Sequence, residues 1–180
     1  VGTSALVANT TASNNTAVGF QAGLSNTTGD ATTAIGTKAL RGNTTGRFNS
    51  ALGYESLYAN TTGTYNVAVG SAALSQNTTA SGNTAVGYHA LTANTTAADN
   101  TSVGYFAGKS NTTGAYNTFI GKDAGLTNTT GTLNSFIGEY SGRLTTGSNN
   151  TFLGQQSGTY ITSGTKNTII GRYNGNQGGL

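Results

Sequence analysis

The amino-acid sequence predicts an all-β protein, a parallel β-solenoid of about ten 17-residue coils. The first observation behind this prediction is a repeat marked by single glycines, which are 17 residues apart at every step except the 16 between Gly138 and Gly154. A period this strict is typical of architectures in which each unit stacks on its neighbours. The marker glycines are Gly2, Gly19, Gly36, Gly53, Gly70, Gly87, Gly104, Gly121, Gly138, Gly154 and Gly171.

Strand chemistry inside each unit is the second observation. Residues 83–96 read Asn-Thr-Ala-Val-Gly-Tyr-His-Ala-Leu-Thr-Ala-Asn-Thr-Thr, so a short Thr- and Val-rich segment is bounded by the turn formers Gly and Asn. Thirdly, no segment has the 3.6-residue apolar spacing of a helix, and the unit is too short for a strand–helix–strand crossover. We therefore expect a single domain over residues 1–180, a rod of order 50 Å because coils stack ~4.8 Å apart.

The composition argues against several classes of function. Charged residues make up 7% of the chain, and the formal net charge of +3 comes from scattered side chains, so no nucleic-acid partner is expected. Without cysteine the chain forms neither disulfides nor thiolate metal sites. No apolar run approaches the ~20 residues of a membrane helix, so no membrane span is expected. The chain begins in the middle of a repeat, which we interpret as part of a longer or processed protein.

Asparagine recurs at two places in the unit, and stacked coils would turn each place into a ladder. Stacked Asn side chains hydrogen-bond along the axis and tolerate the backbone of a corner, where we also expect the marker glycines. The first ladder comprises Asn9, Asn26, Asn43, Asn60, Asn77, Asn94, Asn111 and Asn128. The second comprises Asn15, Asn49, Asn66, Asn83, Asn100, Asn117, Asn134, Asn150 and Asn167, with Thr32 as the exception.

The two residues before each marker glycine are both apolar in most units. Neighbours on a strand point to opposite faces, so one file fills the coil and the other forms a stripe along the rod, which usually marks an interface. We assign the file next to the glycine, such as Val18, to the core. The other file is the predicted seam of a homo-oligomer, which Ala68→Asp should disrupt. It comprises Ala17, Ala34, Ala51, Ala68, Ala85, Ser102, Phe119, Phe136, Phe152 and Ile169.

The seam file changes from Ala to Phe after residue 102. On the seam interpretation, the copies approach closely in the N-terminal half and are wider apart or more intertwined in the C-terminal half. The alternative is that Phe119, Phe136 and Phe152 fill a larger coil interior.

The Asn-Thr-Ala-Val-Gly and Ser-Phe-Ile-Gly units resemble the head repeats of YadA-type trimeric autotransporter adhesins and the repeat arrays of phage and bacterial tail-fibre-like proteins. The resemblance covers essentially all of residues 1–180 and implies a left-handed, homotrimeric β-roll. It also implies an extracellular, cell-surface or virion location and a structural and adhesive role, as a stiff rod that carries or forms a surface for a glycan or protein receptor. In the fibre-like proteins a self-trimming chaperone domain often follows such an array. A self-assembling extracellular filament is the first alternative.

Ice binding is the second alternative function. Paired threonines build two files, one of which should face outward because strand neighbours alternate. The pairs begin at Thr27, Thr44, Thr61, Thr78, Thr95, Thr112 and Thr129. The files are equally consistent with ordinary strand threonines bonded along the axis.

Little in the sequence points to catalysis, so no enzyme, cofactor or metal site is expected. Lys38 and Glu55, and likewise Lys122 and Glu139, fall on consecutive coils as exposed ion pairs worth ~0–1 kcal/mol. Asp123 lies close enough to Glu139 to suggest a retaining glycosidase pair, but the adjacent lysine gives an ordinary explanation. His89 is the only histidine and is expected at the surface.

Two other side-chain sets have alternative roles. Tyr88 and Tyr105 should stack on consecutive coils, as should Phe48 and Tyr65, either to pack the strands or to contact sugar rings. Glycosylation sequons are frequent, but they coincide with the asparagine ladders, so we favour corner residues over glycan acceptors. The sequons begin at Asn9, Asn14, Asn26, Asn43, Asn60, Asn77, Asn94, Asn100, Asn111, Asn128 and Asn149.

Overall fold

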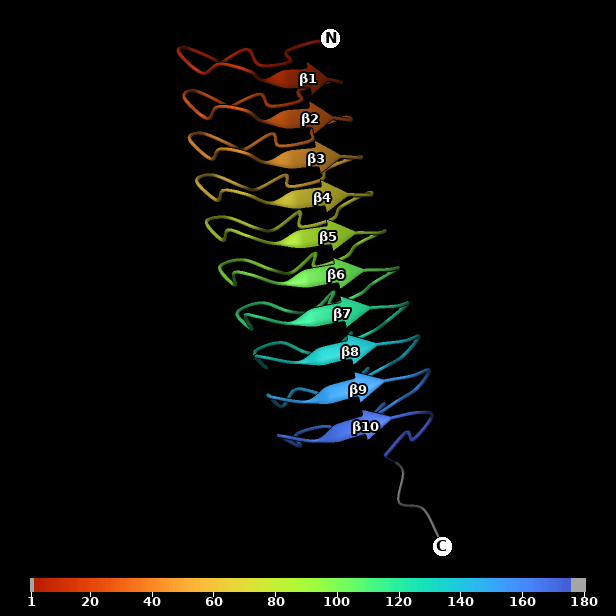
Figure 1. The fold of residues 1–180 in the computed structure, drawn as a ribbon. Coiled ribbons are helices and arrows are strands. Elements are labelled where there is room, and N and C mark those ends of the chain that lie inside the picture. Colours follow the sequence, from red (N-terminus) through yellow and green to blue (C-terminus); the bar gives the residue numbers. More distant parts are fainter. Residues whose placement is uncertain (1, 176–180) are drawn as a thin grey trace, which may run out of the picture.

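A computed structural model of the chain describes residues 2–175 and confirms the all-β parallel solenoid. Ten three-residue strands lie in sequence order in one sheet, and each pairs in parallel with the next (Figure 1). The strands are β1 (Thr16–Val18), β2 (Thr33–Ile35), β3 (Ser50–Leu52), β4 (Val67–Val69), β5 (Thr84–Val86), β6 (Thr101–Val103), β7 (Thr118–Ile120), β8 (Ser135–Ile137), β9 (Thr151–Leu153) and β10 (Thr168–Ile170).

Each coil has a front layer, which is the strand, and a back layer of turns that returns the chain to the next strand (Figure 1). Successive coils are in register, as in the pairing of Ala17 with Ala34. The back layer is also joined from coil to coil by backbone hydrogen bonds, such as that from Leu40 N–H to the Ser56 carbonyl at 2.9 Å. Both layers therefore satisfy backbone groups between neighbouring coils, which is the arrangement that a strict period predicts.

The marker glycines confirm the predicted corner role. From Gly19 to Gly154 their φ angles lie between +127° and +139°, a region that residues with a side chain rarely adopt. The corners are also crowded, because a Cβ atom on Gly87 would lie 2.4 Å from the carbonyl oxygen of Gly104. Only glycine allows successive corners to approach this closely.

The predicted seam file fills the coil interior, so its assignment to an oligomer surface was wrong. Eight of its ten members are buried within the single chain, and Ala17 and Ile169 at the two ends are partly buried against the same core. The buried members are Ala34, Ala51, Ala68, Ala85, Ser102, Phe119, Phe136 and Phe152. The physical reason is the thinness of the coil, whose interior is shared by the strand residue and one partner residue of the back layer.

That partner changes together with the strand residue. In the N-terminal half a buried alanine is combined with a buried leucine of the back layer, as with Ala85 and Leu91. In the C-terminal half phenylalanine is combined with glycine, as with Phe136 and Gly142, where a Cβ atom on the glycine would lie 2.4 Å from the ring. The switch from Ala to Phe is therefore an exchange of interior volume, and the alternative interpretation, that the rings fill the interior, is confirmed.

Replacing the Phe–Gly combination of one coil by the Ala–Leu combination should show that the strand residue and its back-layer partner contribute jointly to stability. Phe136→Ala should cost about 3 kcal/mol of unfolding free energy through the cavity it leaves. Gly142→Leu should be destabilising alone, because the added side chain meets the Phe136 ring. The double variant recreates the Ala85–Leu91 combination, and Leu91 already adopts a φ of +49° at this place, so its loss should be well below the sum. Urea unfolding of the four proteins measures the coupling, and additive losses would contradict it.

The single 16-residue step is absorbed at a turn. Thr145 takes the place of a first-ladder asparagine, since its N–H bonds the Gly142 carbonyl as Asn128 N–H bonds that of Gly125. Gly147 then takes the place of Gly131, because its carbonyl accepts a hydrogen bond from Asn134 at 2.8 Å. The omitted residue is the second, exposed threonine of the Thr-Thr-Gly turn.

Candidate functional site

The most extensive surface feature is an aliphatic file along the outside of the front layer. We call it the outer aliphatic stripe. It is the file that sequence reasoning placed in the core, and eight of its ten side chains are at least 36% exposed. It comprises Val18, Ile35, Leu52, Val69, Val86, Val103, Ile120, Ile137, Leu153 and Ile170. An apolar stripe therefore exists as the sequence predicted, but on the opposite face of the strands.

The stripe is continuous and regular. Each strand contributes one Val, Ile or Leu, and the in-register pairing places these side chains on successive steps, as Val103 pairs with Ile120. At ~4.8 Å per step the nine steps span roughly 43 Å. The neighbouring outward file on the same strands is mostly Thr or Ser, so the front of the rod is uncharged from β1 to β10.

The first asparagine ladder is buried and bonded as predicted. Asn77 Nδ2 donates to Asn60 Oδ1 at 2.8 Å and to the Ala80 carbonyl at 3.0 Å, and its Oδ1 accepts from Asn94 Nδ2 at 3.0 Å. Every member from Asn26 to Asn128 is at most 1% exposed. From Asn26 to Asn111 each amide thus links its coil to the preceding one and closes its own turn, whereas Asn128 bonds only within its own turn, to Gly131.

The second asparagine ladder lies at the entrance to the strands. Asn83 N–H donates to Asn66 Oδ1 at 3.0 Å, and Asn83 Nδ2 donates to the Ala97 carbonyl at 2.9 Å. The exception, Thr32, uses its N–H and hydroxyl to bond Asn15 Oδ1. Both ladders therefore connect successive coils through side-chain hydrogen bonds.

Burial separates the glycosylation sequons into two groups. Eight of the eleven begin at a fully buried asparagine, whose amide is not accessible in the folded rod. The other three begin at Asn9, Asn14 and Asn149, which are exposed. This supports the interpretation of the ladder asparagines as corner residues.

The threonine files divide as expected. The hydroxyl of the first threonine of a pair donates to a carbonyl of the next coil, as Thr44 does to Thr61 at 3.0 Å, whereas the second, such as Thr45, is exposed. The exposed threonines form a single file on the turn that we call the Thr edge, the turn that contains Thr-Thr-Gly. The opposite turn, which follows each marker glycine, is the Gly edge.

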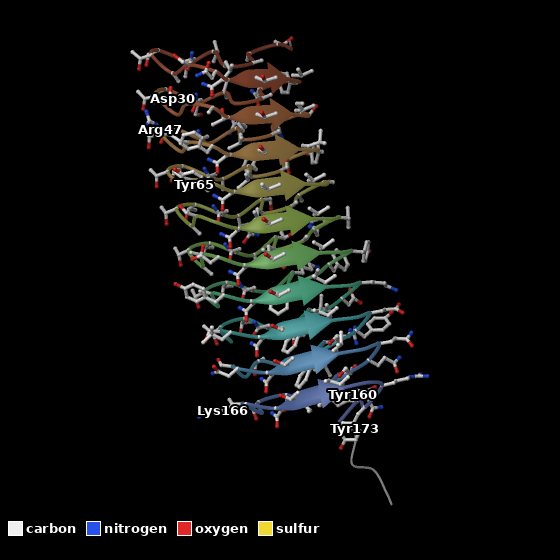
Figure 2. The ribbon with its side chains drawn as sticks, in the orientation of Figure 1. Asp30, Arg47, Tyr65, Tyr160, Lys166 and Tyr173 are labelled. Atoms are coloured by element: carbon white, nitrogen blue, oxygen red, sulfur yellow. The ribbon has the colours of Figure 1, made fainter. Side chains whose placement is uncertain are left out.

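Aromatic ladders occur on both edges, as predicted. On the Thr edge the rings of Phe48 and Tyr65 stack at 5.0 Å, beside the ion pair of Asp30 with Arg47 (Figure 2). On the Gly edge the rings of Tyr88 and Tyr105 stack at 5.4 Å.

The Tyr88–Tyr105 stack belongs to a larger cluster. Phe106 packs against Tyr105 with ring centroids 4.1 Å apart, and Lys109 Nζ lies 4.3 Å above the Phe106 ring. His89 contacts Tyr88 edge-on, and burial together with Lys109 lowers its pKa. The imidazole therefore stays neutral at neutral pH and serves as part of the packing, with Thr92 as its hydrogen-bond partner at 3.0 Å.

The charged residues of the Gly edge form the predicted ion pairs. Lys38 Nζ lies 3.2 Å from Glu55, and the hydrogen bond to this carboxylate raises the lysine pKa. Lys122 Nζ lies 3.8 Å from Glu139. Asp123 is buried and faces Arg143 at 3.8 Å, so the two acids that suggested a glycosidase pair each have a cationic neighbour. Within residues 2–175 no group of three or more potential metal ligands is found.

A hollow of about 180 Å³ lies on the Gly edge near the C-terminal end of the described chain. It is lined by Tyr140, Arg143, Gln156, Thr159, Tyr160 and Asn174. Sequence reasoning missed it, because the lining comes from successive coils. The available signal was the equal spacing of Tyr140 to Arg143 and of Gln156 to Thr159. It places Tyr140 next to Gln156 and Arg143 next to Thr159 on consecutive coils.

Comparison with known proteins finds no matching family model, no matching curated protein and no matching solved structure. In the part of the chain that the structure describes, no helix is long and apolar enough to cross a membrane.

Proposed function

We propose that this chain is a structural and adhesive segment of an extracellular fibre, either a surface adhesin or a phage-like tail fibre. The coil is left-handed, and three copies associate side by side as a homotrimer through the outer aliphatic stripe. The rod acts mechanically, as a stiff spacer that carries or forms a receptor-binding surface, and it is not an enzyme. The observation that carries the proposal is the stripe itself, because eight of its ten aliphatic side chains are exposed in the single chain.

The shape of the stripe favours other copies of the same chain as its occupant. It is straight, uncharged and repeats at the coil spacing, so an identical rod in parallel orientation presents the same residues at the same spacing. A large exposed apolar stripe usually marks an interaction site. Symmetric association also brings each stripe against its equivalents, as closed homo-oligomers require.

Charging the stripe at its centre tests the proposal. The double variant Val103→Asp/Ile120→Asp adds two exposed carboxylates per chain. In the proposed trimer these carboxylates meet where the outer aliphatic stripes of the copies come together. We expect the native mass from light scattering to fall from near three times the 18.0 kDa of one chain to that of a monomer, with the β-sheet circular dichroism retained.

The matched control is Thr96→Asp/Thr113→Asp on the Thr edge, where both side chains are exposed on consecutive coils. It introduces the same charges and should keep the oligomeric mass. A wild-type chain that is already monomeric would contradict side-by-side association, and thermal hysteresis of the exposed Thr-edge file would then be the next assay. A mass that grows with concentration would favour the filament instead.

A further inference from the structure

We propose that the hollow on the Gly edge, between Tyr140, Arg143 and Tyr160, is a binding site for a carboxylate-bearing sugar residue, of the uronic acid type. The inference deepens the proposed adhesive function by assigning a ligand class to one place on the rod, and it rests on that function. The stripe that would join the copies belongs to the front layer, whereas the hollow belongs to the turns of the Gly edge.

The size of the hollow suits one ring-shaped group. Its volume of about 180 Å³ is smaller than the ~300–1,000 Å³ of pockets that enclose drug-sized ligands. Two aromatic residues, Tyr140 and Tyr160, and two amide residues, Gln156 and Asn174, belong to its lining. Tyr160 is 53% exposed and lies at the C-terminal end of the rod near Tyr173 (Figure 2). An amphipathic ligand with both an apolar face and hydroxyl groups matches this lining.

Arg143 supplies the charge. Its guanidinium lies 5.5 Å from the centre of the Tyr140 ring, and its Nε is shielded from solvent without a hydrogen-bond partner. The nearest carboxylate, that of Asp123, is 3.8 Å from this Nε, which is longer than a hydrogen bond. Within residues 2–175 the terminal nitrogens of Arg143 donate no hydrogen bond to the protein. A planar carboxylate is the group that a guanidinium binds best, because two N–H groups can donate to it in parallel.

The surrounding charges favour an acidic ligand over a neutral one. Arg172 donates to Gln156 Oε1 at 3.2 Å and makes no ion pair within the described chain. Lys122 donates to the Tyr140 hydroxyl at 2.9 Å and is paired with Glu139. Three cations thus surround two carboxylates, and one of these, Asp123, is buried beneath the guanidinium.

The test is a calorimetric titration of the intact wild-type protein with sodium glucuronate, compared with glucose and with sodium acetate. We expect glucuronate to bind and the two other compounds to bind at least tenfold more weakly. Arg143→Gln should weaken glucuronate binding about tenfold or more, because a charge-assisted pair is lost. Tyr160→Ala, at an exposed side chain, should weaken it as well without affecting the fold.

Arg41 offers a matched control, since it occupies the same repeat position as Arg143, six coils closer to the N-terminus. Its guanidinium is already bonded to Gln21 at 3.1 Å and to the Tyr58 hydroxyl at 3.2 Å, so Arg41→Gln should leave glucuronate binding unchanged. Equal binding of glucose and glucuronate, or full binding by Arg143→Gln, would overturn the inference. Acetate binding as tight as glucuronate would overturn its sugar component.

Light scattering on the same samples separates this inference from the fibre proposal. A trimer that binds no glucuronate would contradict the sugar site alone. A monomer that binds glucuronate through Arg143 would contradict the trimer alone.

Discussion

Replacing Ala68 by aspartate should unfold the coils around β4 instead of merely separating one copy from another. Ala68 is fully buried between Ala51 and Ala85 of the adjacent strands, so the new carboxylate has neither water nor a partner. Burial of this kind raises a carboxyl pKa by about 3–5 units from its unfolded value of about 3.9, so the folded chain must take up a proton at pH 7, which costs about 4 kcal/mol. Overpacking adds about 1–3 kcal/mol. The sum reaches the lower end of the ~5–15 kcal/mol that stabilises an ordinary domain.

The neighbouring residue provides the control for Ala68→Asp. Val69 is adjacent in the same strand but points outward, as part of the outer aliphatic stripe. Val69→Asp should therefore keep its circular dichroism and melting temperature close to those of the wild type, while its native mass falls. If Ala68→Asp stayed folded and only dissociated, the side-chain directions described above would be reversed.

Asn77→Asp should cost almost as much, although the two side chains have nearly the same shape. The carboxylate loses both donated hydrogen bonds and places negative charge against two acceptors, Asn60 Oδ1 and the Ala80 carbonyl. With a pKa raised by about 3–5 units in the folded state, the loss at pH 7 is about 4 kcal/mol.

The pH dependence identifies the cause of that loss. Because the folded-state pKa lies above the unfolded value of about 3.9, the cost is fully present above the folded pKa. It decreases as pH falls towards 3.9, since protonation removes the charge and restores one donor. Urea unfolding between pH 7 and pH 4 measures this recovery, with the exposed Asn149→Asp as a charge-matched control. A loss that is independent of pH would show that the ladder amide is not held as described.

The sequence was sufficient to predict the all-β parallel solenoid, because the glycine period, the strand chemistry and the asparagine positions all have direct physical consequences. The direction of the strand side chains was not predictable from alternation alone, since both files are apolar. The missing information was the paired change from Ala85 with Leu91 to Phe136 with Gly142, six residues apart in each case. When the side chains of a strand file become larger as the back-layer residues become smaller, that file must point towards the back layer.

The back layer was less predictable for a different reason. Non-glycine residues such as Lys38 and Leu57 adopt φ angles of +59° and +49° there, in a region that L-residues rarely occupy. Nothing in their chemistry indicates this conformation, which is imposed by hydrogen bonds to the coils on either side. The hollow at Arg143 was also missed, because its lining residues come from separate coils.

The exchange of interior volume along the rod also bears on how nearly identical coils find their correct partners during folding. A chain of equal repeats can pair one unit out of place without losing hydrogen bonds, so the ladders alone specify register only weakly. A slip of one unit at the boundary would instead bring Phe119 into a coil built for alanine and leucine, or leave a glycine-lined space unfilled. The boundary therefore distinguishes the N-terminal coils from the C-terminal coils and opposes a slipped alignment across it.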